Sequence, residues 1–147
     1  MTIYLDASVL VSLFVRDRNS ARAEVILRTT APVLVVSDFA AAEFSSAVAR
    51  RVRTADLTVQ AARDAFLNFD GWTARSARRV ETVAADVAQA TSFVRRLDLP
   101  LRAPDALNIA ITQRIGARLM TFDVGMEAAA RTLNIPLLEQ DTAGRPG

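Results

Sequence analysis

Residues 32–36 read Pro-Val-Leu-Val-Val, an apolar run that is almost unbroken. A strand buried on both faces, as in a parallel sheet covered by helices, has this pattern, whereas a half-exposed strand alternates apolar and polar residues. Shorter runs of the same kind lie at 2–5 and 118–122, and weaker ones at 80–83 and 136–138. We therefore expect a mainly parallel sheet of four to five strands.

Helical patterns lie between and around these strands. They cover residues 8–15, 19–29, 39–52, 58–69, 86–97, 104–115 and 124–133. Asn19 and either Ser37 or Asp38 stand where N-caps are expected, and the stretch 68–79 predicts a loop. Strands that alternate with helices predict an α/β layer structure with right-handed crossovers. The expected organisation is one domain over residues 1–140 and a flexible tail at 141–147.

Composition excludes several kinds of chemistry. The 147 residues are 51% apolar and 23% charged, which is typical of one globular domain, and they contain neither Cys nor His. Thiolate nucleophiles, Ser-His-Asp triads and His- or Cys-ligated metals are therefore excluded. Five glycines are too few and too scattered for a phosphate-binding glycine loop. No apolar run approaches the roughly 18 residues of a membrane span, and the first residues lack a signal-peptide pattern, so we expect a cytoplasmic protein.

All 18 basic residues are arginines, in a chain whose net charge is only +2. Guanidinium groups match phosphate geometry, so this composition is compatible with RNA binding, although a genome that favours Arg codons produces it equally well. Clusters at 50–53 and 95–96 are open to a second interpretation, as complements of helix dipoles. Trp72, beside the arginines at 75–79, is expected to pack or form an interface rather than to stack on bases.

Four acidic residues stand where chemistry is expected. Asp6 and Asp123 each follow a strand, at the sheet edge where ligands of parallel sheets gather, although an aspartate there also caps the next helix. Glu43 shares a helix face with apolar residues, which is costly unless the carboxylate is paired, reaches solvent or holds a cation. Asp105 lies in the first turn of a helix, a position that the helix dipole also favours.

Carboxylates gathered at one strand edge repel one another, and protonation or a multivalent cation relieves that repulsion. Without His or Cys, a site made only of oxygen ligands for Mg²⁺ or Mn²⁺ is the natural solution. Such an ion acidifies a bound water and stabilises charge on a phosphoryl oxygen, as in phosphodiester cleavage.

The order and spacing of four segments resemble the PIN-domain ribonucleases, and among them the VapC toxins of bacterial toxin–antitoxin pairs. The segments are Asp6-Ala7-Ser8, Ala42-Glu43-Phe44, Leu-Arg-Ala-Pro-Asp-Ala-Leu-Asn-Ile-Ala at 101–110, and Thr121-Phe122-Asp123. The resemblance covers residues 1–140. It implies a three-layer α/β/α sandwich, Mg²⁺- or Mn²⁺-dependent endoribonuclease activity, a homodimer and inhibition by a VapB-like antitoxin. Many members of the family carry His where this chain has Asn108, which affects local hydrogen bonding or substrate preference.

The resemblance also implies roles for individual residues. Asp6 and Asp105 are expected as metal ligands, with Asp123 completing the set. Glu43 is expected as a ligand, directly or through water, or as the group that orients the attacking water. Ser8 and Thr121 are expected either to hold the carboxylates in place or to form routine capping bonds. Arg102 is either a phosphate contact or an ordinary surface residue.

Two other functions stay open at this point. One is a PIN nuclease that acts in RNA processing rather than as a toxin. The other is a catalytically silent module that binds RNA or protein and keeps its acids for structural reasons.

Overall fold

The computed structural model describes residues 1–139, and the side chains of all of these except Thr29 and Thr30. In chain order the elements are β1 (Thr2–Leu5), α1 (Ala7–Phe14), α2 (Ser20–Thr30), β2 (Val33–Ser37), α3 (Asp38–Arg53), α4 (Val59–Ser76), β3 (Ala77–Val80), α5 (Ala84–Val94), α6 (Ala103–Arg114), β4 (Arg118–Met120) and α7 (Val124–Thr132). The tail expected at 141–147 lies outside the described residues.

The sheet is parallel throughout, with strand order β3-β2-β1-β4. Tyr4 in the central strand β1 stands opposite Val35 of β2 and Leu119 of β4. The expected strand at 136–138 is reduced to one parallel bridge between Leu137 and Leu119. The α/β/α architecture with a parallel sheet is thus confirmed.

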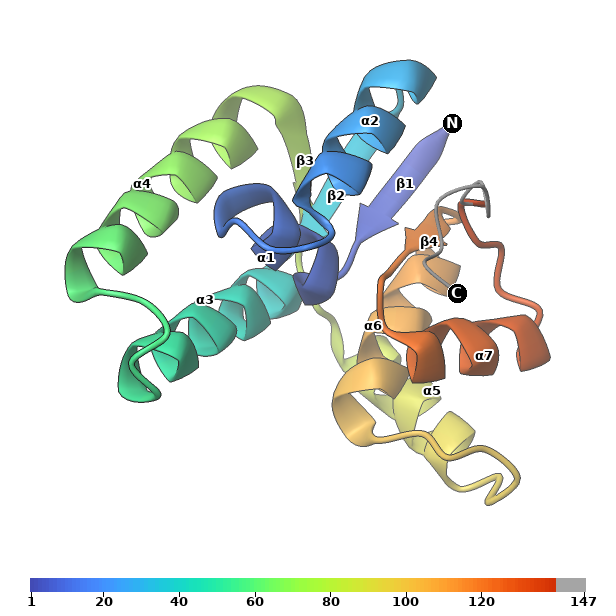
Figure 1. The fold of residues 1–147 in the computed structure, drawn as a ribbon. Helices are drawn as coiled ribbons and strands as arrows, with labels where there is room; N and C mark the ends of the chain where they lie inside the picture. The colour runs from blue at the N-terminus through green and yellow to red at the C-terminus, as the bar shows by residue number, and fades with distance from the viewer. Residues whose placement is uncertain (140–147) are drawn as a thin grey trace.

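Helices cover both faces of the sheet. Helix α1 packs against α2, α3 and α4, while α5 packs against α6, and Figure 1 shows these two groups on either side of the strands. The buried core includes Ile3, Tyr4 and Leu5 of β1 and Val35 and Val36 of β2. These strands are central because their apolar runs lose water on both faces. Within the described residues, no helix is long and apolar enough to cross a bilayer.

The prediction of a loop at 68–79 is wrong. Helix α4 continues to Ser76, and β3 begins directly afterwards at Ala77, three residues earlier than expected. Phe69 and Trp72 extend the apolar face of α4 against Phe14 of α1, with ring centroids 5.5 and 5.4 Å apart. This packing outweighs the cost of about 1 kcal/mol for Gly71 inside a helix. Trp72 is therefore a packing residue, as expected.

Helix starts explain much of the local chain path. Ser37 caps α3 by accepting a hydrogen bond from the amide of Ala40 at 2.9 Å, so Ser37 rather than Asp38 is the N-cap. Asn19 precedes α2, but its side chain forms no capping bond. The carboxylate of Asp17 instead accepts a hydrogen bond from the backbone N–H of Asn19, at 2.8 Å. An Asx-type turn has thus replaced the expected cap.

Candidate active site

Asp6 is the most constrained acid of the strand edge. It follows β1, and the residue is 2% exposed. Oδ1 accepts hydrogen bonds from the Ser8 hydroxyl at 2.6 Å and from the Val9 amide at 3.1 Å, and so caps α1. Oδ2 accepts a hydrogen bond from the Thr121 hydroxyl at 2.5 Å. Both oxygens of Asp6 are therefore held in place from two different strand ends.

Burial raises the pKa of Asp6 to about 6. The hydrogen bonds from Ser8, Thr121 and Val9 act in the opposite direction, and the charge of Asp123 raises the pKa further. A buried carboxylate that keeps three donors and still has a raised pKa is a destabilised anion. A cation placed nearby would stabilise it.

Ser8 and Thr121 join the ends of β1 and β4. The Ser8 hydroxyl accepts the Phe122 amide at 2.9 Å, and the Thr121 hydroxyl accepts the Asp123 amide at 3.0 Å. Asp123 in turn caps α7, because its Oδ1 accepts the Met126 amide at 2.9 Å. Asp6 and Asp123 are thus both helix caps, an alternative that the sequence left open, and both also lie at the carboxyl edge of the sheet.

Glu43 is held at the half-buried end of a chain of hydrogen bonds that leads into the core. Its Oε1 accepts Nδ2 of Asn108 at 2.6 Å, and the same amide nitrogen donates to the Pro104 carbonyl at 3.0 Å. Oδ1 of Asn108 accepts the Tyr4 hydroxyl at 2.5 Å. The Tyr4 oxygen lies 2.6 Å from the Ser37 hydroxyl, which is free to donate because the Tyr4 proton points to Asn108.

This chain links four elements from three parts of the sequence that lie far apart, because β2 and α3 are consecutive. It runs from Ser37 at the end of β2, through Tyr4 in β1 and Asn108 in α6, to Glu43 in α3. Burial raises the pKa of Tyr4 above its usual range, so the phenol stays protonated and keeps donating. Burial also raises the pKa of Glu43, and the charges of Asp6 and Asp105 add to that effect.

Tyr4 and Ser37 were missed by the sequence analysis. The available signal was a tyrosine inside an otherwise apolar strand, because a buried phenol needs a hydrogen-bond partner. Nothing in the sequence identified that partner as Asn108, which lies 104 positions away.

Asp105 lies in the first turn of α6 and is weakly neutralised. Its nearest cation is Arg102, at 3.9 Å between Oδ2 and Nε, and the Arg102 side chain is 83% exposed. An ion pair that is this long and this exposed contributes little. Burial raises the pKa of Asp105, and the charge of Asp123 raises it further, while Arg102 lowers it only in part.

The four acids are electrostatic neighbours in a closed ring. The charge of Asp123 raises the pKa of both Asp6 and Asp105. The charges of Asp6 and Asp105 in turn raise the pKa of Glu43. However, no three acidic side chains of residues 1–139 are close enough together to hold a metal ion between them. Mutual repulsion favours this separation, and hydrogen bonds fix Asp6 and Glu43 within it.

The donor chemistry of the ring fits a hard divalent cation. Every available ligand is a carboxylate oxygen, which Mg²⁺ and Mn²⁺ prefer. Asp105 forms no hydrogen bond to the described part of the chain, so its side chain can turn at little cost, whereas Asp6 is held rigidly. Asp6 would therefore be the fixed ligand of such an ion, and Asp105 would be free to turn toward it.

The chain is similar to known proteins over most of its length. Residues 3–132 match the family model described as "PIN domain". The chain is 34% identical over 139 residues to a protein named Ribonuclease VapC46 from Mycobacterium tuberculosis, covering 92% of this chain and 95% of that one.

Two solved structures share the fold at low sequence identity. VapC20 of Mycobacterium tuberculosis, described as a sarcin-ricin loop cleaving toxin, superposes with a TM-score of 0.69 at 22% identity, over 86% of this chain and 94% of that one. VapBC2 from Rickettsia felis, bound to a DNA fragment from its promoter, has a TM-score of 0.68 at 15% identity, over 96% of this chain and all of that one. With its parallel sheet, its acids at the carboxyl edge and a family match over most of its length, the chain belongs to the PIN domain family.

Proposed function

We propose that this protein is a divalent-metal-dependent endoribonuclease, and that it is the toxin of a VapBC-type toxin–antitoxin pair. The observation that carries the proposal is the ring formed by Asp6, Glu43, Asp105 and Asp123. Their negative charges repel one another, and they lie at the edge of the sheet where parallel α/β folds bind ligands. The relative that is named a ribonuclease, matched over nearly the whole chain, supports RNA as the substrate.

Asp6, Asp105 and Asp123 would hold Mg²⁺ or Mn²⁺. When bound, the ion supplies an acidified water and stabilises charge on phosphoryl oxygens. Asp6 provides the fixed ligand, because Ser8 and Thr121 hold both of its oxygens.

Glu43 completes the ligand set, directly or through water, or orients the water that attacks the phosphodiester. Asn108 fixes its Oε1 at 2.6 Å, which leaves Oε2 to face that water. The raised pKa of Glu43 moves it toward the range of a useful proton acceptor. Hydrolysis of this kind leaves a 5′-phosphate and a 3′-hydroxyl.

The partner in this proposal is a VapB-like antitoxin, encoded by a short reading frame next to the gene. The similar Rickettsia felis structure is a VapBC pair, which supports a toxin rather than a nuclease of general RNA processing. We further propose a homodimer that acts in the cytoplasm.

One observation favours a different function, a catalytically silent binding module. The carboxylates of Asp6 and Asp123 cap α1 and α7, and no three acids of the described chain converge on a metal position. In this second candidate, the acids serve the fold alone.

Cleavage of total RNA with Mn²⁺ separates these functions. Asp6→Asn and Asp105→Asn should each lose at least about 100-fold in turnover, as expected when metal binding is impaired. Asp70→Asn, an exposed acid on α4, is the matched control and should cleave like wild type. Wild-type turnover in both site variants contradicts the proposed nuclease. Absence of Mn²⁺ binding by calorimetry, with RNA binding intact, supports the silent module.

A further inference from the structure

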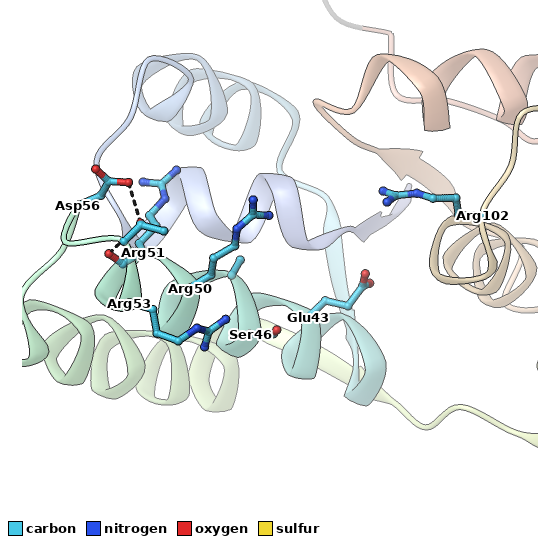
Figure 2. A pocket seen from close by; sticks show the side chains of 9 residues that line it. Glu43, Ser46, Arg50, Arg51, Arg53, Asp56 and Arg102 are labelled. Atoms are coloured by element: carbon cyan, nitrogen blue, oxygen red, sulfur yellow. Dashed lines mark hydrogen bonds between the residues drawn. The ribbon is translucent and has the colours of Figure 1, made fainter.

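A cleft of about 720 Å³ opens beside Glu43 and is lined mainly by arginines. Its lining residues are Glu43, Ser46, Ala47, Arg50, Arg51, Arg53, Thr54, Asp56 and Arg102. Figure 2 shows that all but Arg102 come from α3 and the turn after it, whereas Arg102 reaches across from the start of α6. The cleft is therefore built by two elements that also carry acids of the ring.

The cleft follows one face of a helix away from the acids. Glu43, Ala47 and Arg50 are spaced by four and three residues, so they lie along one side of α3. Arg50 is two turns from Glu43, about 10 Å along the axis. A chain bound in this cleft with one end at the acid ring therefore passes Arg50.

The arginines of the cleft have few internal partners. Arg50 and Arg53 are exposed and form no ion pair with the described residues. Arg51 has only a 4.0 Å contact with Asp17, and Arg102 only the 3.9 Å contact with Asp105. Four guanidinium groups thus face two carboxylates, and the cleft attracts anions although the net charge of the chain is only +2.

The lining chemistry also indicates which part of a nucleic acid fits. The nine residues include no aromatic side chain on which a base could stack. Guanidinium groups and the hydroxyls of Ser46 and Thr54 are suited to phosphate oxygens, and such contacts fix register without reading sequence. An acidic protein segment would meet the same charges, but the Glu43 end of the cleft repels a carboxylate chain. An RNA chain extends past that end, because the proposed cleavage places its scissile phosphate at the acids.

We infer that this cleft binds the backbone phosphates of single-stranded RNA on one side of the scissile bond, through Arg50 and Arg102, without selecting bases. The inference rests on the proposed nuclease function and extends it to substrate positioning. Base preference is then set by residues outside this cleft.

Binding of fluorescein-labelled 12-mers of uridylate and adenylate tests the inference, by anisotropy of the full-length protein in EDTA with 50–200 mM KCl. Arg50→Ala should weaken binding to both 12-mers by the same factor. It should also reduce the slope of log K against log[KCl] by about 0.7. Between 50 and 200 mM KCl, the affinity of the variant then falls about 2.6-fold less than that of wild type. Arg50→Lys should keep the wild-type slope, because it keeps the charge.

Arg118→Ala is the matched control, because Arg118 is an exposed arginine at the opposite, amino-terminal edge of the sheet. It should bind both 12-mers like wild type. An Arg50→Ala effect no larger than that of Arg118→Ala, an effect on one homopolymer only, or no RNA binding by wild type overturns the inference. Unchanged RNA affinity combined with weaker binding of a deca-glutamate peptide assigns the cleft to an acidic protein partner, and also overturns it.

The two proposals fail in different ways. In one case Arg50→Ala has no effect on binding, while RNA is cleaved with Mn²⁺ and Asp6→Asn abolishes cleavage. The proposed role of the cleft is then wrong and the proposed nuclease function stands. If the binding effect is present but no RNA is cleaved, the nuclease is wrong and phosphate binding stands.

Discussion

Replacing Asp6 with asparagine should stabilise the metal-free protein at pH 8 even though it removes activity. In the folded protein, burial raises the pKa of this carboxyl from its ordinary 3.8 to about 6. The shift corresponds to about 3 kcal/mol at 1.36 kcal/mol per unit. Between these two pH values the folded chain holds a proton at Asp6 and the unfolded chain does not. The stability that the neutral carboxyl contributes is therefore complete below pH 3.8 and is lost as the pH rises through about 6.

Asparagine is neutral at every pH and thus avoids that loss. It also places an N–H group where Asp6 now has an accepting oxygen, next to Ser8 and Thr121, at a cost of about 1 kcal/mol. The net gain of Asp6→Asn at pH 8 is then about 2 kcal/mol, or roughly 4–8 °C in the midpoint of thermal unfolding for a domain of this size. Near pH 3.5 the gain disappears and the variant is slightly less stable than wild type.

Urea unfolding followed by circular dichroism measures this difference. Wild type and Asp6→Asn are compared in EDTA at pH 3.5 and 8, with Asp70→Asn as control. A second series at pH 8 contains Mg²⁺, which at 100 times its dissociation constant stabilises wild type by about 2.7 kcal/mol. The variant lacks a ligand and should gain less than about 0.7 kcal/mol, so the order of stability reverses. If Asp6→Asn is no more stable than wild type at pH 8 in EDTA, or if Mg²⁺ stabilises both equally, the account of Asp6 as a destabilised metal ligand is wrong.

Three further substitutions test the surrounding structure. Tyr4→Phe should lower the free energy of unfolding by about 1–3 kcal/mol, because buried polar atoms of Ser37 and Asn108 lose a partner; a loss near zero in urea unfolding contradicts the hydrogen-bond chain. Asn108→Ala should lower kcat by about 10–100-fold with little change in KM, since Glu43 loses the group that orients it; steady-state cleavage that changes only in KM opposes this positioning role. Arg114→Ala should destabilise the protein by about 3 kcal/mol, because it leaves the buried Asp86 carboxylate without the cation 2.7 Å away; a loss below about 1 kcal/mol by urea unfolding is inconsistent with this.

Strands were easier to predict than the boundary between α4 and β3. The run at 32–36 locates β2 to within one residue of its bounds, because an unbroken apolar run fits few structures other than a strand buried on both faces. The end of α4 was missed because Gly71 and nearby arginines are typical of a loop. Contacts of Phe69 and Trp72 with Phe14 decide that boundary, and they involve a helix more than fifty residues away.

Residue types and their places along the chain are local information, and the sequence alone determined them. It placed Asp6 and Asp123 at strand ends and excluded any site that needs His or Cys. Only the tertiary structure decided that Tyr4 and Asn108 connect β1 to Glu43, that the four acids form a ring without converging, and that α3 and α6 enclose the arginine cleft. Periodicity records which face of one element is buried, whereas distances and pKa values across elements depend on how separate elements pack and exclude water.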